Sequence, residues 1–210
     1  MLQAQTLEHT HYTISNRTPE AHKATPSMSQ MADRHNECGK MRYFTPELYL
    51  QLQSADDSVV DKAMEQWDAA SASYRNDLER LRREMPPQIR PITELRLHDW
   101  NLVDAFDGSN EDRGMPATIV LKDANRFTIL CYWVSGKVQR IDPPPHRVWY
   151  KDKIQWLYDE IDLMDEVNRT FVHRILFSDG TTLLIPFSDC RVLKAKSDHT
   201  MSHADLVQIA

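Results

Sequence analysis

Glycine is scarce in this chain, and its scarcity excludes several classes of enzyme. The 210 residues include five glycines, at positions 39, 108, 114, 136 and 180. Their spacing forms neither the G-x-G-x-x-G nor the G-x-x-x-x-G-K-[ST] pattern, in which backbone N–H groups cradle a phosphate. The G-x-S-x-G turn that exposes the nucleophilic serine of many esterases is also missing. We therefore expect neither an ordinary nucleotide-dependent enzyme nor an ordinary esterase, and no cofactor.

Cysteines and long apolar runs are also few. The three cysteines, Cys38, Cys131 and Cys190, form no C-x-x-C pair, which is typical of a reducing compartment. The longest uncharged run, 127–136, is about half of the roughly 20 residues that a membrane helix needs. The chain begins with neither a basic segment nor a continuous apolar segment, so no secretory signal is predicted. We expect a soluble, cytoplasmic protein without a membrane partner.

Positive charge is in deficit. The chain has 25 Lys and Arg residues against 31 Asp and Glu residues, a net charge of −6. Because nonspecific binding to nucleic acid depends on an excess of cations, we expect no nucleic-acid partner. Hydrophobic residues make up 41% and charged residues 27%, which is typical of a globular domain. A chain of this length can build a core without disulfides or a structural metal.

The two ends of the chain differ from its middle. Residues 1–40 show no sustained helical or alternating apolar period, so they cannot bury enough surface to offset their ordering entropy. They are interpreted either as a disordered tail or as a mis-called start upstream of Met41, and both readings stay open. We predict a single α+β domain over residues 41–196, followed by a polar C-terminal tail at 197–210.

Residues 41–87 are predicted to form the helical part of the domain. Thr45 is a suitable N-cap, and Pro46 suits the first helical position. A long helix is predicted over about 56–85, where the proline pair 86–87 ends it. Its apolar positions recur at heptad spacing: Val60, Met64, Trp67, Tyr74, Leu78, Leu81 and Met85. One seam position is serine, so packing within the chain is favoured over a free-standing coiled coil.

Residues 92–196 are predicted to form an antiparallel sheet. They are rich in β-branched and aromatic residues, with turn residues at short intervals. Asp179-Gly180 predicts a type I′ hairpin turn, in which both residues have positive φ. Residues 154–164 fit a helix or a strand and are interpreted as a strand. Because no strand–helix alternation follows, the predicted fold is α+β, with N-terminal helices packed on an antiparallel sheet of about six to seven strands.

Several strings resemble those of a known family. MRYFTPELY, LHDW and WLYDEID followed by HRILFSDG are similar to strings in a family of uncharacterised bacterial proteins described as a domain of unknown function. The resemblance covers about residues 41–193 and leaves 1–40 outside. It implies that WLYDEID is a strand and that Met41 is the usual start. It implies no activity and no catalytic residues.

The adjacent pair His98 and Asp99 is the first candidate for chemistry. Adjacent His and Asp residues can hold a divalent ion jointly, as in metal-dependent phosphohydrolases. Such a site needs further ligands, and the two side chains would point to opposite faces of a strand. We therefore interpret the pair as structural, with Asp99 accepting backbone N–H groups at a bend.

His173 is the second candidate. It lies in phase with the apolar residues Phe171, Ile175 and Phe177. A histidine on an apolar face is usually satisfied by a neighbour, here by an acid from the run at 159–162. A general base is the alternative, but no nucleophile stands at a recognisable spacing.

Two further groups of residues are interpreted as inert. Cys131 has the phase of a buried thiol, and Cys190 lacks the cationic surroundings of a reactive one, apart from Arg191. His199 and His203 have the spacing that places two imidazoles on one helical face. The glutamate of a metalloprotease motif is missing between them, so a solvated tail is predicted.

An acidic run is the last feature that points to function, and its members are Asp159, Glu160, Asp162, Asp165 and Glu166. It is either an interaction patch for a basic protein partner or a partner for the arginines of the long helix, Arg75, Arg80, Arg82 and Arg83. With no complete catalytic set in the sequence, we predict a non-catalytic protein-binding module, immunity-like or regulatory. The alternative is a metal-dependent hydrolase that uses His98 and Asp99, with His173 as a third residue.

Overall fold

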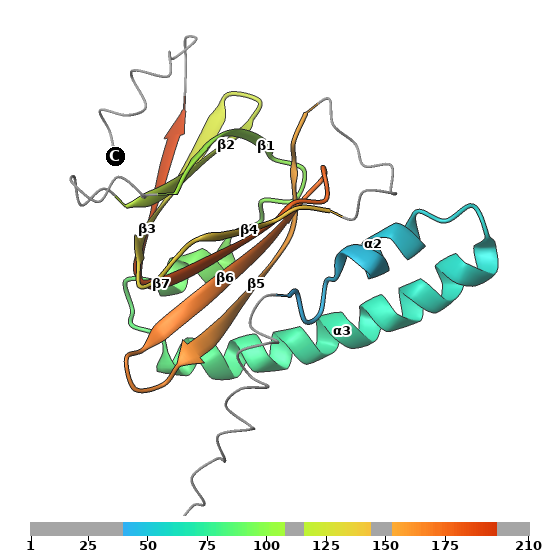
Figure 1. The fold of residues 1–210 in the computed structure, drawn as a ribbon, viewed down its shortest axis with the longest axis horizontal. Coiled ribbons are helices and arrows are strands. Elements are labelled where there is room, and N and C mark those ends of the chain that lie inside the picture. Colours follow the sequence, from blue (N-terminus) through green and yellow to red (C-terminus); the bar gives the residue numbers. More distant parts are fainter. Residues whose placement is uncertain (1–39, 108–115, 144–152, 197–210) are drawn as a thin grey trace, which may run out of the picture.

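The computed structural model describes residues 40–107, 116–143 and 153–196 (Figure 1). The predictions for residues 1–39 and for 197–210, which include His199 and His203, lie outside the described residues. Within the described ranges the fold is α+β with an antiparallel sheet, as predicted. No helix in these ranges is long and apolar enough to span a membrane.

Two α-helices and a short 3-10 helix precede the strands in the described chain. They are α2, Pro46–Leu52, α3, Asp57–Glu84, and η1, Arg90–Glu94. The Thr45 hydroxyl and the Asp56 carboxylate each accept a hydrogen bond from a first-turn backbone N–H, at 3.2 and 2.9 Å. α3 ends where Met85, the residue before Pro86, takes an extended conformation. The range of α3 confirms the predicted long helix.

Seven strands of the described residues form one antiparallel sheet. They are β1, Asn101–Phe106, β2, Ala117–Asp123, β3, Arg126–Val134, β4, Gln139–Ile141, β5, Trp156–Asp165, β6, Thr170–Phe177, and β7, Thr182–Lys196. The order is β1-β2-β3-β7-β6-β5, and β4 pairs with β7 beside this path. β5 confirms that residues 154–164 contain a strand.

The turn between β6 and β7 differs from the predicted type I′ turn. Gly180 has a φ of 79°, but Asp179 does not have a positive φ. Gly180 N donates to Phe177 O, and Phe177 N donates to Thr181 O, both at 2.9 Å. The Asp179 carboxylate accepts a hydrogen bond from Thr181 N at 2.9 Å, which holds Asp179 in an Asx turn without a positive φ. The loop therefore has three residues, with glycine in the left-handed position.

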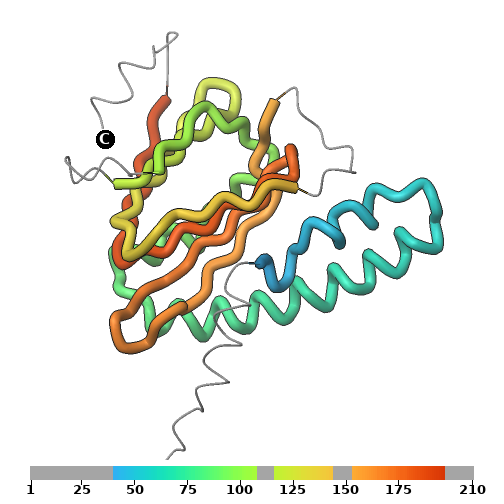
Figure 2. The backbone as a smooth tube through the Cα atoms, viewed as in Figure 1, coloured from blue at the N-terminus to red at the C-terminus, as the bar shows by residue number. Residues whose placement is uncertain are grey.

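The sheet curls into a half-barrel, and the sequence does not predict this curl (Figure 2). Asp99 N donates to Trp156 O, and Trp156 N donates to Trp100 O, both at 2.9 Å. Leu102 N donates to Ile154 O at 2.8 Å. These bonds join the start of β1 to the start of β5, so the two edges of the sheet meet at one end. The main core fills the curl, with Trp156, Phe171, Phe177 and Phe187 among its fully buried side chains.

α3 runs along β5, which is an edge strand in the sheet order. The backbone N–H of Ile161 donates to the Tyr74 hydroxyl at 2.9 Å, so α3 satisfies a donor that faces away from β6. Trp67 lies in an outer apolar cluster with Phe44, and their ring centroids are 4.7 Å apart. Leu78 contacts the main core instead. The apolar stripe of α3 is therefore divided between two clusters.

Replacing Trp67 by Ala should destabilise the protein by about 2–4 kcal/mol, because its ring contacts both Phe44 and Tyr158. Met64, on the same helix, is 49% exposed and supplies the control, since Met64→Ala should change stability by less than about 0.5 kcal/mol. Denaturant unfolding and sedimentation measure the two effects. An unchanged stability of Trp67→Ala with an altered oligomeric state would show instead that the stripe joins two chains.

Candidate functional site

His98 and Asp99 lie at the junction between the two edges of the sheet. His98 Nδ1 is 2.9 Å from Asp99 Oδ2, and the two side chains are 50% and 67% exposed. Asp99 has a φ of 66°, which turns the chain into β1. Its carboxylate contacts the His98 imidazole and accepts none of the described backbone N–H hydrogen bonds, so the expected role as their acceptor at a bend is wrong. The His98 ring lies 5.1 Å from the ring of Tyr158.

His173 is buried in the main core, and the structure brings it to a member of the acidic run. Its Nε2 is 3.1 Å from Asp159 Oδ2, and its Nδ1 is 2.9 Å from the hydroxyl of Tyr132. Asp159 Oδ1 accepts a further hydrogen bond from Trp156 Nε1 at 3.0 Å. The expectation that an acid from 159–162 satisfies His173 is confirmed. Tyr132 completes a chain of three polar side chains, which we call the Asp–His–Tyr chain.

The Asp–His–Tyr chain has the order of a catalytic triad but lacks access for a substrate. Tyr132 and His173 are fully buried, and only Asp159, 32% exposed at its side chain, reaches water. Burial raises the pKa of Tyr132 well above its usual value, so the phenol stays protonated and can donate to His173 Nδ1. His173 Nε2–H then donates to Asp159. The arrangement satisfies the two buried polar groups of Tyr132 and His173 and holds β3, β6 and β5 together.

The candidate metal ligands do not come together. Among the described residues, no group of three or more His, Cys, Asp or Glu side chains is placed to hold a metal ion. His98 and Asp99 contact one another at the junction of β1 and β5, whereas His173 bonds to Tyr132 in the core. The ligand set that a metal-dependent hydrolase would need is therefore not assembled from these three residues.

The cysteines among the described residues are Cys131 and Cys190, and both are buried. Burial raises the pKa of the Cys131 thiol and of the Cys190 thiol, and the Asp189 carboxylate adds to the shift at Cys190. A raised pKa lowers the fraction of thiolate, which is the reactive form. Neither cysteine is suited to act as a nucleophile.

The acidic run does not present one surface. Asp159 points into the core, whereas Glu160 and Asp162 point to the outer face of β5. Asp165 accepts hydrogen bonds from Val167 N and Asn168 N in the β5–β6 turn. Of the five acids, only Glu166 makes no hydrogen bond or ion pair with a described residue. The strand alternation therefore separates residues that are adjacent in sequence.

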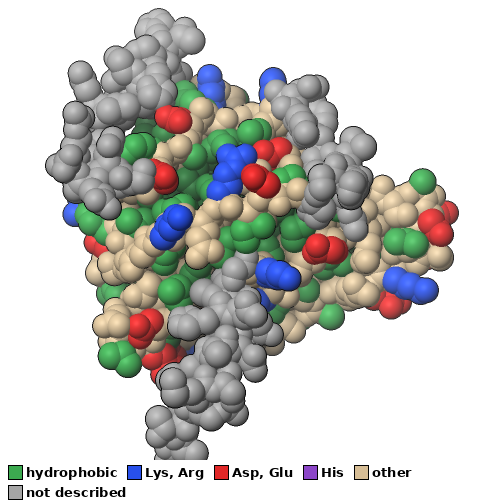
Figure 3. All heavy atoms as spheres, viewed as in Figure 1, with side chains coloured by type: hydrophobic (Ala, Val, Ile, Leu, Met, Phe, Trp, Pro, Cys, Tyr) green, Lys and Arg blue, Asp and Glu red, His purple; other side chains and the backbone are tan. Residues whose placement is uncertain are grey.

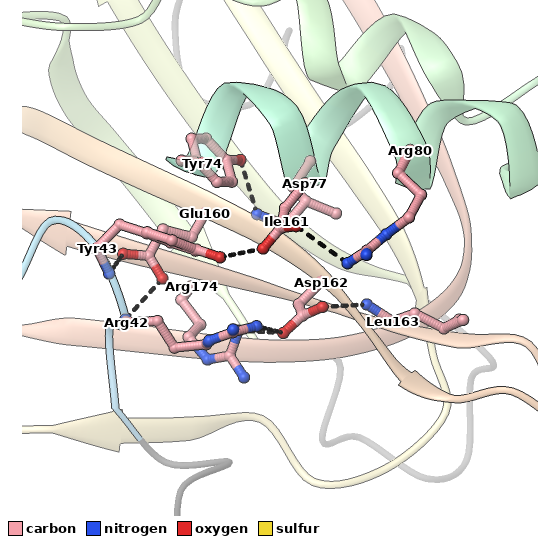
Figure 4. A network of polar contacts seen from close by, with 10 residues as sticks. All are labelled: Arg42, Tyr43, Tyr74, Asp77, Arg80, Glu160, Ile161, Asp162, Leu163 and Arg174. Atoms are coloured by element: carbon pink, nitrogen blue, oxygen red, sulfur yellow. Dashed lines mark hydrogen bonds and ion pairs between the residues drawn. The ribbon is translucent and has the colours of Figure 1, made fainter. Parts of the chain in front are cut away.

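Glu160 is the centre of the network on the outer face (Figure 4). Its Oε2 accepts a hydrogen bond from Arg42 N at 2.8 Å, and its Oε1 accepts bonds from Tyr43 N and Phe44 N at 2.7 Å each. Burial raises the pKa of Glu160, while these donors and the charge of Arg174 oppose the rise. One side chain thus holds three consecutive backbone N–H groups of the segment that precedes α2.

Arginines from outside α3 neutralise the outer carboxylates. Asp162 lies 2.8 Å from Arg42 Nη1 and 3.8 Å from Nη1 of the buried Arg174. The arginines of α3 that form ion pairs use other partners, with Arg80 on Asp77 and Arg82 on Glu94. Arg174 Nε and Nη1 make no hydrogen bond within the described residues. Its positive charge is instead compensated by the nearby carboxylates of Asp162 and Glu160.

A cavity of about 400 Å³ opens at one end of the half-barrel. Ten of its fourteen lining residues are apolar, and they come mainly from β1, β2, β6 and β7. Hydrophobic side chains gather on the face seen in Figure 3, with Lys, Arg, Asp and Glu among them. The polar lining residues are Asp107, Arg140, Asp179 and Thr181. We call this space the mouth cavity, and no sequence motif marks it.

The mouth cavity adjoins the Asp–His–Tyr chain. Ala117, which lines the cavity, stands opposite Tyr132 in the strand register, and Ile185 stands opposite His173. Neither Tyr132 nor His173 lines the cavity itself. The Asp–His–Tyr chain therefore lies beside the cavity, on strands that pair with those of the lining residues.

Comparison of the chain with protein-family models, curated proteins and solved structures found no significant match.

Replacing Glu160 by Leu should destabilise the protein by about 2–4 kcal/mol, because three backbone donors lose their acceptor and the buried Arg174 loses a nearby negative charge. The isosteric Glu160→Gln keeps one acceptor oxygen and should cost about 1–2 kcal/mol. Glu166→Gln is the control and should change stability by less than about 0.5 kcal/mol. Hydrogen exchange gives a local readout, since the amides of residues 42–44 should lose protection in Glu160→Leu. Unchanged protection there would contradict the role of Glu160.

Removing the hydroxyl of Tyr132 tests the Asp–His–Tyr chain. Tyr132→Phe leaves His173 Nδ1 without a partner and should cost about 1–3 kcal/mol at neutral pH. Tyr158→Phe is the control, because the Tyr158 hydroxyl makes no hydrogen bond among the described residues. Denaturant unfolding measures both effects.

The same variant has an expected pH dependence. The folded pKa of Tyr132 is raised, so its contribution to stability is present below the ordinary tyrosine pKa of about 10 and is lost as the pH rises above it. The stability difference between wild type and Tyr132→Phe should therefore shrink above about pH 10. A difference that stays constant there would show that Tyr132 ionises as readily in the folded state as in the unfolded state.

Proposed function

We propose that this protein is a non-catalytic binding protein whose ligand occupies the mouth cavity. The proposal rests on the kinds of residue that line the cavity. A concave site with mostly apolar walls and a few polar groups is typical of sites for small organic molecules, and about 400 Å³ lies within their usual size range. Small barrels commonly hold such ligands inside or at the mouth.

The chemistry of the described residues supports binding rather than catalysis. The Asp–His–Tyr chain is closed off from the cavity, and both placed thiols have raised pKa values. No histidine, cysteine, serine or lysine is among the described residues that line the mouth cavity, and the Thr181 hydroxyl donates to the Asp179 carboxylate at 3.0 Å within the β6–β7 turn. A ligand in the cavity would meet apolar walls and hydrogen-bonding groups at the rim.

The polar groups at the rim favour a ligand with one anionic or strongly accepting group. Arg140 Nη2 lies 3.3 Å from Thr181 Oγ1, and Arg140 Nε donates to Asp142 Oδ1 at 3.1 Å. The Arg140 and Asp142 side chains are both well exposed, and exposed ion pairs contribute little to stability. A ligand carboxylate can therefore replace Asp142 at Arg140. The ligand class we propose is a medium-sized carboxylic acid with an apolar body.

Filling the mouth cavity tests this proposal. Ala105 lines the cavity and is exposed, so Ala105→Trp should occupy the opening without disturbing the buried core. Dodecanoate should bind to the wild type with one-to-one stoichiometry in calorimetry, and Ala105→Trp should weaken it by about tenfold or more. Ala72→Trp, at an exposed position of α3, is the control and should leave the affinity unchanged.

A second variant tests the anionic group. Arg140→Gln should weaken dodecanoate and leave the uncharged dodecanol unaffected, because only the acid uses the guanidinium. The proposal is wrong if neither compound binds saturably, or if Ala105→Trp and Ala72→Trp bind equally well.

A further inference from the structure

A second cavity, of about 370 Å³, lies at the other end of β3 and β7 from the mouth cavity. The mouth cavity takes Leu183 and Ile185 from the beginning of β7, whereas this one takes residues 194–196 from its end. The remaining walls come from residues 95–97 with Trp100 and from the first residues of β3. We call this space the basic cavity.

The charge of the basic cavity is opposite to that of the whole chain. Its lining includes Arg96, Arg126, Lys194 and Lys196 and no acidic residue, although the chain carries a net charge of −6. Arg126 pairs with Asp123 outside the lining. The other three cations make no hydrogen bond or ion pair with the described residues. Within the part of the chain that the structure describes, three cations around one cavity therefore have no acidic side chain as an ion-pair partner.

The register of β3 and β7 brings three of the four cations, Arg126, Lys194 and Lys196, close together. Arg126 stands directly opposite Lys196, and Lys194 stands opposite Thr128, two residues further along β3. Like charges directly opposite one another across two strands are destabilising. The Arg126 guanidinium also lies 5.3 Å from the centre of the Trp100 ring, which fixes its position over an apolar wall. An anion bound in the cavity would offset the repulsion between these cations and would contact the Arg126 guanidinium.

We propose that the basic cavity binds a small phosphate-bearing molecule. Four cations line this one cavity, and together they favour an anion that carries several negative charges over a single carboxylate. Phosphate oxygens also match the planar fork of an arginine and the point charge of a lysine. Trp100 and Leu95 form an apolar wall beside the charges, so the rest of such a molecule has surface to contact. The site is separate from the mouth cavity and does not depend on the function proposed for it.

Tripolyphosphate is the first probe, and ATP is the second. Tripolyphosphate should bind saturably to the full chain with one-to-one stoichiometry in calorimetry, and more weakly as salt is added. Equal affinities for the two probes would assign binding to the phosphates alone. Tighter binding of ATP with a change in tryptophan fluorescence would assign the ligand to the nucleotides, because the organic part then lies near Trp100.

A pair of matched charge variants separates the site from a general effect of charge. The double variant Lys194→Gln and Lys196→Gln should weaken tripolyphosphate by about tenfold or more. The double variant Lys40→Gln and Lys62→Gln removes the same charge at exposed positions outside both cavities and should keep the wild-type affinity.

The melting temperature distinguishes anion binding from a purely structural role of Lys194 and Lys196. Without anion, the Lys194 and Lys196 double variant should be at least as stable as the wild type, because repulsion is relieved. Tripolyphosphate should raise the melting temperature of the wild type and not of that variant. The proposal is overturned by absence of saturable binding, by equal loss in the control variant, or by equally tight binding of citrate.

Discussion

The acceptance of three consecutive backbone N–H groups by the Glu160 carboxylate is the interaction on which the helical part of the structure depends. It fixes residues 42–44 against the outer face of β5. Phe44 then lies within 6 Å of the rings of Trp67, Tyr74 and Tyr158. That contact holds α3 beside the edge strand, where the Tyr74 hydroxyl meets Ile161 N. Without the carboxylate, the buried N–H of Phe44 and the partly buried N–H groups of Arg42 and Tyr43 would lack an acceptor, and such groups are costly.

The same strand carries two unrelated polar networks because its side chains alternate. Asp159 points inward to His173 and Trp156, and its neighbour Glu160 points outward to residues 42–44. On β6 the same division separates His173, in the core, from Arg174, beside Asp162. Four adjacent polar residues in two strands therefore stabilise both faces of the sheet. This distribution explains why an acidic run in the sequence does not become an acidic patch.

The curl of the sheet produces two ends of different chemistry. At one end, the first residues of β7 and the neighbouring strands surround an apolar cavity with Arg140 at its rim. At the other end, Arg126, Lys194 and Lys196 face the second cavity. Both sites use residues that the strands bring together over long sequence separations. The two ligands that we propose, an apolar acid at one end and a phosphate at the other, follow this difference in lining.

The local sequence was sufficient to predict the helices and strands, whereas the polar networks and the two cavities are determined only by the tertiary structure. The N-cap of α2, the proline pair that ends α3 and the alternation of β6 act over a few residues, so they could be predicted. The acid partner of His173 was also predictable, because the hairpin places 159 near 173. Tyr132 is 41 residues from His173, and Arg42 is 118 residues from Glu160. Such contacts, the curl and both cavities depend on which strands become neighbours. That choice is made by the packing of the whole core and leaves no periodic signal in the chain.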